Sequence, residues 1–277
     1  MKTFKTFDGL SLAYRDDGPR DGLPVLCLAG LTRDSRNFTY LAEHLGDVRL
    51  ICMDYRGRGQ SDWAPDRSSY AISVESRDAL ALLDHLGLPA AAIIGTSRGG
   101  LIAMTLALTA RTRVLGVCLN DIGPELDPLG LSRIFDYLGK RPAYATAEAM
   151  ARDKPNTMIG FSGVPAARWL QEVQHQTVTR ADGLDIPYDP ALREAVLDAS
   201  DPEQPVDLWP FFDALQGLPT GLIRGANSDL LSRETAQKMR ARHPEMLFAD
   251  IPDRGHVPFL DEPAALHLIR KWIDQCR

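Results

Sequence analysis

Three side chains in this sequence could together activate a hydroxyl group for attack on a carbonyl carbon. Ser97 stands in Gly95-Thr96-Ser97-Arg98-Gly99, directly after an apolar run and directly before a helical one. A sharp strand-to-helix turn holds a serine in a strained backbone conformation, where a Cβ on either flanking glycine would collide with the chain. The placement predicts that Ser97 is a nucleophile at the start of a helix, whose positive end favours developing negative charge.

A serine hydroxyl is a weak nucleophile unless a neighbouring imidazole takes its proton. We expect His256 to be this base, because it lies in a loop, residues 253–258, after the last predicted strand. Open α/β sheets place their sites at the carboxyl ends of the strands. The other five histidines are expected on helices, at a helix end or in an insertion: His44, His85, His175, His243 and His267.

An imidazole base needs a carboxylate that fixes its tautomer and stabilises its cation. We expect Asp229 to be this acid, since it lies just past a predicted strand and completes the chain order serine, aspartate, histidine. Asp121 is the alternative acid, because it follows the strand expected after the nucleophile. Loop aspartates are also common as helix caps and turn residues, so neither position is diagnostic by itself.

The negative charge that develops on a carbonyl oxygen requires two preorganised backbone N–H donors. We expect one donor to be Arg98, the residue after the nucleophile, and the other to be Leu31 in Ala29-Gly30-Leu31-Thr32. Gly30 lets that loop bend close to a substrate. The resulting mechanism would be attack on an ester carbonyl, an acyl-enzyme and its hydrolysis, with no metal ion or organic cofactor needed.

The elements that must position these residues alternate along the chain. Apolar runs predict strands buried on both faces of a parallel sheet at residues 24–29, 48–54, 90–95, 114–120, 219–224 and 246–251. Amphipathic stretches predict helices at residues 74–86, 101–110, 233–242 and 263–272. Residues 3–7 and 10–14, joined by Asp8-Gly9, predict an antiparallel hairpin. The fold class is therefore α/β, with a mostly parallel, doubly wound sheet.

This alternation stops after residue 123. Helical patterns separated by proline and glycine follow at residues 129–139, 146–154, 165–178 and 190–198. We expect one core made of residues 1–123 and 211–277, into which residues 124–210 are inserted as a helical cap. Aromatic side chains in and next to this insertion could line an apolar pocket, although they could equally form the core of the cap: Phe135, Tyr137, Phe161, Trp169, Trp209, Phe211 and Phe212.

The composition of the chain limits the kinds of molecule that it could bind. The net charge of -6 opposes binding to nucleic acid, which depends on clustered Lys and Arg. No apolar run approaches the ~20 residues of a membrane helix, and the first residues lack a hydrophobic signal core, so we expect a cytoplasmic protein. The expected partner is a small-molecule substrate with an apolar portion.

The four cysteines do not suggest a disulfide or a metal site. Cys27, Cys52 and Cys118 fall inside predicted buried strands, and Cys276 stands near the end of the chain. No Cys-x-x-Cys spacing occurs. We expect the three strand cysteines to be small core residues.

These motifs together resemble the alpha/beta-hydrolase superfamily over essentially the whole chain. The resemblance rests on the turn around Ser97, the Gly255-His256 pair, the insertion, and residues 54–62, which are similar to a structural D-x-R-G-x-G-x-S segment of the family. It implies an alpha/beta-hydrolase fold with a helical cap and a serine hydrolase activity. Ala29-Gly30 departs from the His-Gly frequent in the family, which keeps the backbone donor but removes an imidazole beside the pocket.

Arg98 also departs from the Met, Leu or Gln frequent after the serine, and its side chain could face substrate or pair with a carboxylate such as Asp121. Because haloalkane dehalogenases have Asp where this chain has Ser97, we expect cleavage of a carboxylic ester or lactone. The same fold and residues also serve hydrolysis of a carbon-carbon bond in ring-fission products and cofactor-free peroxidase activity. A ligand receptor that does not turn over its ligand is a further alternative.

Overall fold

A computed structural model describes residues 1–199 and 206–277 of the chain. Within them, one eight-stranded sheet has the order β1-β2-β4-β3-β5-β6-β9-β10. Its strands are β1 (Lys2–Lys5), β2 (Ser11–Asp17), β3 (Pro24–Leu28), β4 (Arg49–Met53), β5 (Ala91–Thr96), β6 (Val114–Asn120), β9 (Thr220–Gly225) and β10 (Leu247–Ile251). Pairings β1–β2 and β2–β4 are antiparallel and the others are parallel, which confirms the predicted hairpin and sheet.

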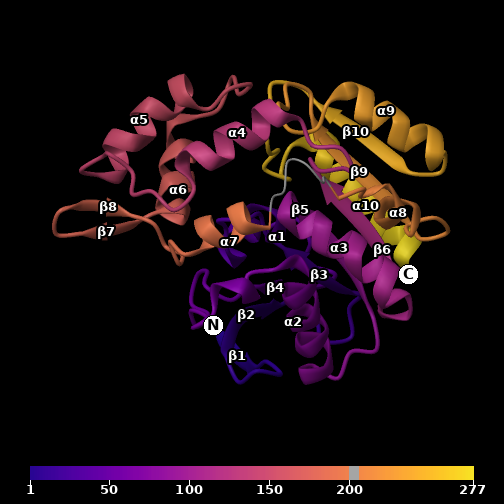
Figure 1. Cartoon of the computed structure of the whole chain (residues 1–277). Helices are drawn as coiled ribbons and strands as arrows, with labels where there is room; N and C mark the ends of the chain where they lie inside the picture. The colour runs from indigo at the N-terminus through magenta and orange to yellow at the C-terminus, as the bar shows by residue number, and fades with distance from the viewer. Residues whose placement is uncertain (200–205) are drawn as a thin grey trace.

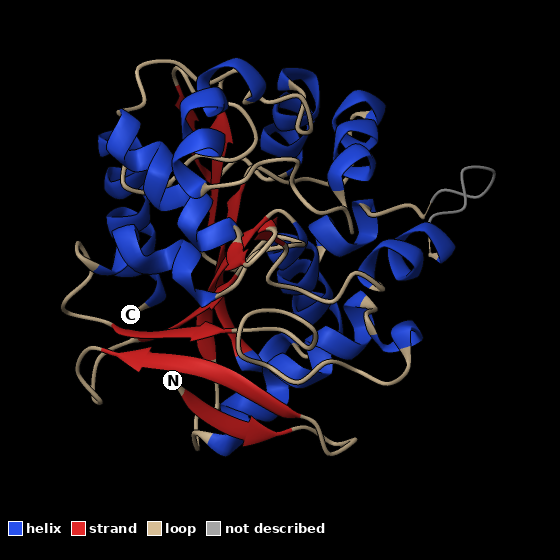
Figure 2. Cartoon of the chain, turned by 90° about the vertical axis from the view of Figure 1, so that its left-hand side faces the viewer, coloured by secondary structure: helices blue, strands red, loops and turns tan. Residues whose placement is uncertain are grey.

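Helices cover both faces of this sheet (Figures 1 and 2). They include α1 (Thr39–Ala42), α2 (Ile72–His85), α3 (Arg98–Thr109), α8 (Trp209–Asp213), α9 (Arg233–Arg242) and α10 (Pro263–Cys276). A Cβ built on Gly116 of β6 would meet Cys276 of α10, whereas one built on Gly100 of α3 would meet Leu119 of β6. Because successive strand residues point to opposite faces, α3 and α10 pack on opposite sides of β6.

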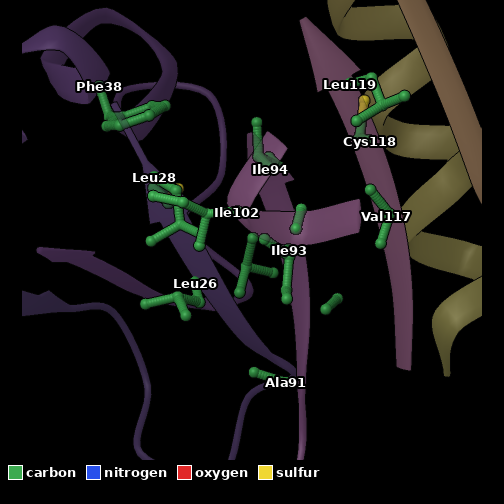
Figure 3. Packing of buried hydrophobic residues seen from close by; sticks show 14 of the residues in the cluster. Leu26, Leu28, Phe38, Ala91, Ile93, Ile94, Ile102, Val117, Cys118 and Leu119 are labelled. Carbon is green, nitrogen blue, oxygen red and sulfur yellow. The ribbon is translucent and has the colours of Figure 1, made fainter. Parts of the chain in front are cut away.

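The core lies between these helices and the central strands, and Figure 3 shows part of it. Its members on β3, β5, β6 and α3 include Leu26, Leu28, Ile93, Ile94, Ile102, Val117 and Leu119, all of which are buried. Strands with apolar residues on both faces are what a doubly covered parallel sheet requires. The cysteines Cys27, Cys52, Cys118 and Cys276 are buried and free, so the prediction that the strand cysteines are core residues is confirmed.

The segment between β6 and α8 leaves the sheet and forms a separate group of elements. It contains α4 (Pro128–Tyr137), α5 (Ala147–Thr157), α6 (Ala166–Gln176), β7 (Val178–Arg180), β8 (Gly183–Asp185) and α7 (Leu192–Asp198). Figure 1 shows α5, α6 and the β7–β8 hairpin beside one another, away from the main sheet. Residues 200–205 of the predicted insertion 124–210 lie outside the described residues. No helix in the described ranges is both long and apolar enough to cross a membrane.

Candidate active site

Ser97 occupies a sharp turn between β5 and α3. Its backbone has φ 50° and ψ -116°, a left-handed conformation that non-glycine residues rarely adopt. A Cβ on Gly95 would lie 2.6 Å from Gly100 Cα, and one on Gly99 would lie 2.6 Å from the Leu28 carbonyl carbon. Only glycine fits at both flanks, as the sequence predicted, and the turn leaves the serine partly exposed.

The imidazole of His256 lies between a hydroxyl and a carboxylate. His256 Nε2 is 3.0 Å from Ser97 Oγ, and His256 Nδ1 is 2.8 Å from Asp121 Oδ2. Because a carboxylate only accepts, Nδ1–H donates to Asp121 and leaves Nε2 free to accept the Ser97 proton. This geometry suits removal of the serine proton by an oriented base.

Asp121, and not Asp229, contacts His256, so the expected pairing of Asp229 with the imidazole is wrong. Asp121 follows β6 immediately, in a left-handed conformation with φ 54°, and its side chain is fully buried. Its Oδ1 accepts the Gly225 N–H at 2.8 Å, and its Oδ2 accepts the Ser228 hydroxyl at 2.6 Å. These donors hold the carboxylate toward His256.

Asp229 lies four residues beyond the end of β9 and makes no hydrogen bond or ion pair with His256. Its carboxylate pairs with Arg133 of α4. The chain order of serine, acid and histidine is satisfied by either aspartate, so order alone could not choose between them. The β6 position is favoured by the sheet order, because β6 is the direct neighbour of the strand that carries Ser97.

Asn120, which was not predicted as a site residue, connects the turn that carries Ser97 with the loop that carries His256. The Ser97 N–H donates to the Asn120 carbonyl at 3.0 Å. The Asn120 side-chain amide donates to the Thr96 hydroxyl at 3.2 Å and to the Pro258 carbonyl at 3.1 Å. The end of β6 therefore fixes both the serine turn and the histidine loop.

The expected oxyanion donors Leu31 and Arg98 lie on segments that approach Ser97. A Cβ built on Gly30, the residue before Leu31, would lie 3.9 Å from Ser97 Cβ. Arg98 begins α3, so its N–H has no acceptor within the helix. Neither N–H donates to a protein acceptor among the described residues. Both donors are thus available to a ligand atom beside the serine.

The Arg98 side chain turns away from Asp121 into a buried ion network. Arg98 Nε donates to Glu75 Oε2 at 2.6 Å, and Arg58 Nη1 donates to Glu75 Oε1 at 2.7 Å. Arg58 Nε also donates to the Leu31 carbonyl at 3.0 Å. Glu75 therefore connects the two segments that carry the expected donors. Burial acts to raise the pKa of the Glu75 carboxyl, but the charges of Arg58 and Arg98 hold this pKa below its ordinary value.

The insertion contacts the histidine loop through two of the aromatic residues singled out in the sequence. Phe161 and Trp169 pack on Phe259, three residues after His256, with ring centroids 5.6 and 6.0 Å away. A Cβ on Gly255 would lie 3.1 Å from the Phe161 ring. Of the other five aromatic residues, Phe135 packs in one cluster with Leu31 and Tyr188, and Trp209, Phe211 and Phe212 pack on the main core. Tyr137 is half exposed, but its hydroxyl lies near Thr32 and Arg33, on the segment that carries Leu31.

Comparisons with known proteins agree with the fold. Residues 24–263 match the model of the alpha/beta hydrolase fold family. A relative from Cupriavidus necator, named 3-hydroxybutyrate-oligomer hydrolase, is 35% identical over 265 residues, covering 92% of this chain and 90% of the relative. The crystal structure of an alpha/beta hydrolase from Novosphingobium aromaticivorans superposes with a TM-score of 0.91 and 38% identity, covering 99% of this chain and 97% of that one.

A thermophilic esterase from Thermogutta terrifontis has the same fold at lower identity. It superposes with a TM-score of 0.73 and 24% identity, covering 100% of this chain and 99% of that chain. At this identity the likeness concerns the fold alone. The family match over residues 24–263 includes both Ser97 and His256.

Proposed function

The chain belongs to the alpha/beta hydrolase family, and from this membership we propose that it is a serine hydrolase that cleaves a carboxylic ester. The observation that supports the proposal most strongly is the line of contacts from Ser97 Oγ through the His256 ring to Asp121. A buried carboxylate, an imidazole and a partly exposed hydroxyl in this order are the parts of an activated serine nucleophile.

In the proposed mechanism, Ser97 Oγ attacks the ester carbonyl carbon while His256 Nε2 takes the serine proton. Asp121 keeps the proton on Nδ1 and stabilises the imidazolium that forms. The intermediate collapses to an acyl-enzyme as His256 returns its proton to the leaving alcohol. Water, deprotonated by the same imidazole, then releases the acid and restores Ser97.

We propose that the backbone N–H groups of Leu31 and Arg98 donate hydrogen bonds to the oxyanion in both tetrahedral intermediates. Glu75 supports this assignment, since the buried ion network with Arg58 and Arg98 restrains both segments. Donors fixed before the reaction stabilise the developing charge without a cost of reorganisation. The imidazole that is absent at Ala29 is not needed for this hydrogen bonding.

We propose that residues 124–210 act as a cap that selects the substrate, since Phe161 and Trp169 pack on the histidine loop. The relative from Cupriavidus necator is named for hydrolysis of 3-hydroxybutyrate oligomers, which are linear esters of a hydroxy acid. A short ester of a hydroxy acid is therefore the substrate class that we propose for this chain.

The proposal is tested by hydrolysis of p-nitrophenyl butyrate and of the linear 3-hydroxybutyrate dimer. We expect Ser97→Ala to reduce kcat by about 10³-fold or more on both esters while the melting temperature stays near that of the wild type. The exposed Ser162 offers a matched control, since Ser162→Ala removes a hydroxyl that has no place in the site. Retention of a tenth of the activity by Ser97→Ala, or cleavage confined to ring-fission diketones, would overturn the proposal.

A further inference from the structure

Arg33 lies close to Gly30 and Ser97, and its side chain has no hydrogen-bond or ion-pair partner among the described residues. It follows Leu31 by two residues, and a Cβ built on Gly30 would lie 3.6 Å from Arg33 Cγ and 3.9 Å from Ser97 Cβ. Its side chain is partly exposed. A guanidinium beside a nucleophile, with its donors unused, is available to an anionic ligand.

A second unpaired cation comes from the insertion. Lys154 on α5 is buried, with 8% of its surface exposed, and it donates to Gln176 Oε1 on α6 at 3.3 Å. The Gln176 amide nitrogen in turn donates to Glu172 Oε2 at 3.1 Å. Lys154 therefore has an amide partner but forms no ion pair among the described residues, which is costly for a buried ammonium group.

The core segment around Arg33 lies against α6. Arg36 Nη1 donates to the Gln174 carbonyl at 3.4 Å, and the ring of Tyr40 lies 5.9 Å from that of His175. Burial lowers the pKa of Lys154, and the positive charge of Arg33 lowers it further, to about 8. Burial raises the pKa of Glu172, and Arg33 opposes that rise.

Two further polar atoms in this contact have no partner. The Tyr40 hydroxyl and His175 Nδ1 are both buried and make no hydrogen bond with the described residues. Burial lowers the pKa of His175, which favours its neutral form. Buried polar groups are normally paired, so two unused groups on neighbouring rings, one from the core and one from the insertion, point to a missing ligand atom.

The charges around this contact leave an excess of positive charge. The neighbouring arginines are already paired, Arg36 with Asp34 and Arg168 with Asp261. Arg33 and Lys154 are the cations of this contact that form no ion pair among the described residues. Glu172 supplies the opposing charge without an ion pair to either. Two cations facing one carboxylate favour an anion of single charge, and a guanidinium binds a carboxylate through two parallel hydrogen bonds.

We propose that Arg33, assisted by Lys154, binds the free carboxylate of an ester substrate whose scissile carbonyl lies at Ser97. The substrate class is then an ester that ends in a carboxylic acid, such as a short hydroxy-acid oligomer, rather than a neutral ester. This inference rests on the proposed serine hydrolase function and names the group that selects its substrate.

The test compares two esters that differ only in the terminal group that Arg33 would bind. They are the linear 3-hydroxybutyrate dimer with its free carboxylate and the same dimer with a terminal primary amide. For the wild type we expect kcat/KM to be about 10- to 100-fold higher for the acid, the range of one charge-assisted contact. In Arg33→Gln this ratio should fall close to one, Arg33→Lys should keep part of it, and Lys154→Met should lower it.

Arg141→Gln is the matched control, because it removes one positive charge from an exposed part of the insertion, where Arg141 pairs with Asp182. This variant should keep the wild-type ratio. A wild-type ratio near one, or a ratio that Arg33→Gln leaves unchanged, would overturn the carboxylate site.

A second experiment, based on inhibition, applies if the enzyme hydrolyses the dimer too slowly for kcat/KM to be measured. Free 3-hydroxybutyrate should inhibit hydrolysis of p-nitrophenyl acetate by the wild type more strongly than 3-hydroxybutyramide does, and Arg33→Gln should remove the difference. Equal inhibition by the acid and the amide would contradict the carboxylate site while Ser97-dependent hydrolysis stands. If the wild type does not hydrolyse p-nitrophenyl acetate at all, the proposed hydrolase function fails instead.

Discussion

His256 Nδ1 lies 2.8 Å from Oδ2 of the fully buried Asp121, which also accepts hydrogen bonds from Gly225 and Ser228. Asp121→Asn would keep the shape of this side chain but would present an amide that favours the wrong imidazole tautomer. We expect kcat to fall by up to ~10⁴-fold, the size of that effect in serine proteases. Steady-state hydrolysis of p-nitrophenyl butyrate measures it, with circular dichroism as the check on folding.

Asp229→Asn is the control for this change, because Asp229 pairs with Arg133 on α4 and does not contact His256. Its turnover should stay within a few-fold of the wild type. A silent Asp121→Asn together with a severe Asp229→Asn would return the acid to the end of β9.

Glu75 should affect stability, because it is the only carboxylate that either Arg58 or Arg98 pairs with among the described residues. Glu75→Gln leaves the buried guanidinium of Arg58 and the largely buried one of Arg98 without their counter-charge, which should lower the free energy of unfolding by about 3–5 kcal/mol. Urea unfolding measures this loss. The exposed Glu43→Gln should change it by less than about 0.5 kcal/mol. A stability of Glu75→Gln equal to that of Glu43→Gln would contradict the role of the network.

Gly99→Ala should destabilise the fold although alanine favours helices. The new Cβ would collide with the Leu28 carbonyl group, and backbone on both sides prevents an easy shift. We expect a loss of about 3 kcal/mol or more. Gly46→Ala is the control, since a Cβ there would meet nothing within 4 Å. Thermal unfolding compares the two variants, and equal melting temperatures would show that the turn at Ser97 tolerates a side chain.

Because of Lys154, the preference for the acid dimer over its amide should fall as the pH rises. Burial and the charge of Arg33 lower the pKa of Lys154 to about 8, with Glu172 as the opposing charge. Lys154 therefore carries its charge below about pH 8 and loses it above. The ratio of kcat/KM for the acid dimer over its amide should fall several-fold between pH 7 and pH 9. Lys154→Met should have a lower ratio that does not change over this interval, and a wild-type ratio that rises with pH would contradict the assignment.

Much of the fold follows from the periodicity of the sequence. The strand β6 begins and ends at the predicted residues 114 and 120, and α9 coincides with the predicted helix over 233–242. These elements are strongly patterned, because burial on one or both faces dictates every apolar position. The hairpin of β7 and β8 was not predicted, since strands of three residues are too short to show an alternation.

The site was predictable only where a residue type is demanded by local geometry. Ser97 follows from the glycines of its turn, and His256 from its loop after the last strand. The choice between Asp121 and Asp229 depended on which strand lies beside β5, a property of sheet order that the sequence does not display. The partners Asn120, Glu75 and Ser228 were missed for a similar reason, because they act through contacts with residues distant in the chain.

The activated state of Ser97 is tested most directly by covalent labelling with a fluorophosphonate, followed by mass spectrometry of the digested protein. We expect one adduct, on the peptide that contains Ser97, formed rapidly in the wild type, slowly in His256→Gln and not at all in Ser97→Ala. A full adduct on Ser97→Ala, or a wild-type adduct on any other peptide, would contradict the assignment of Ser97 as the nucleophile.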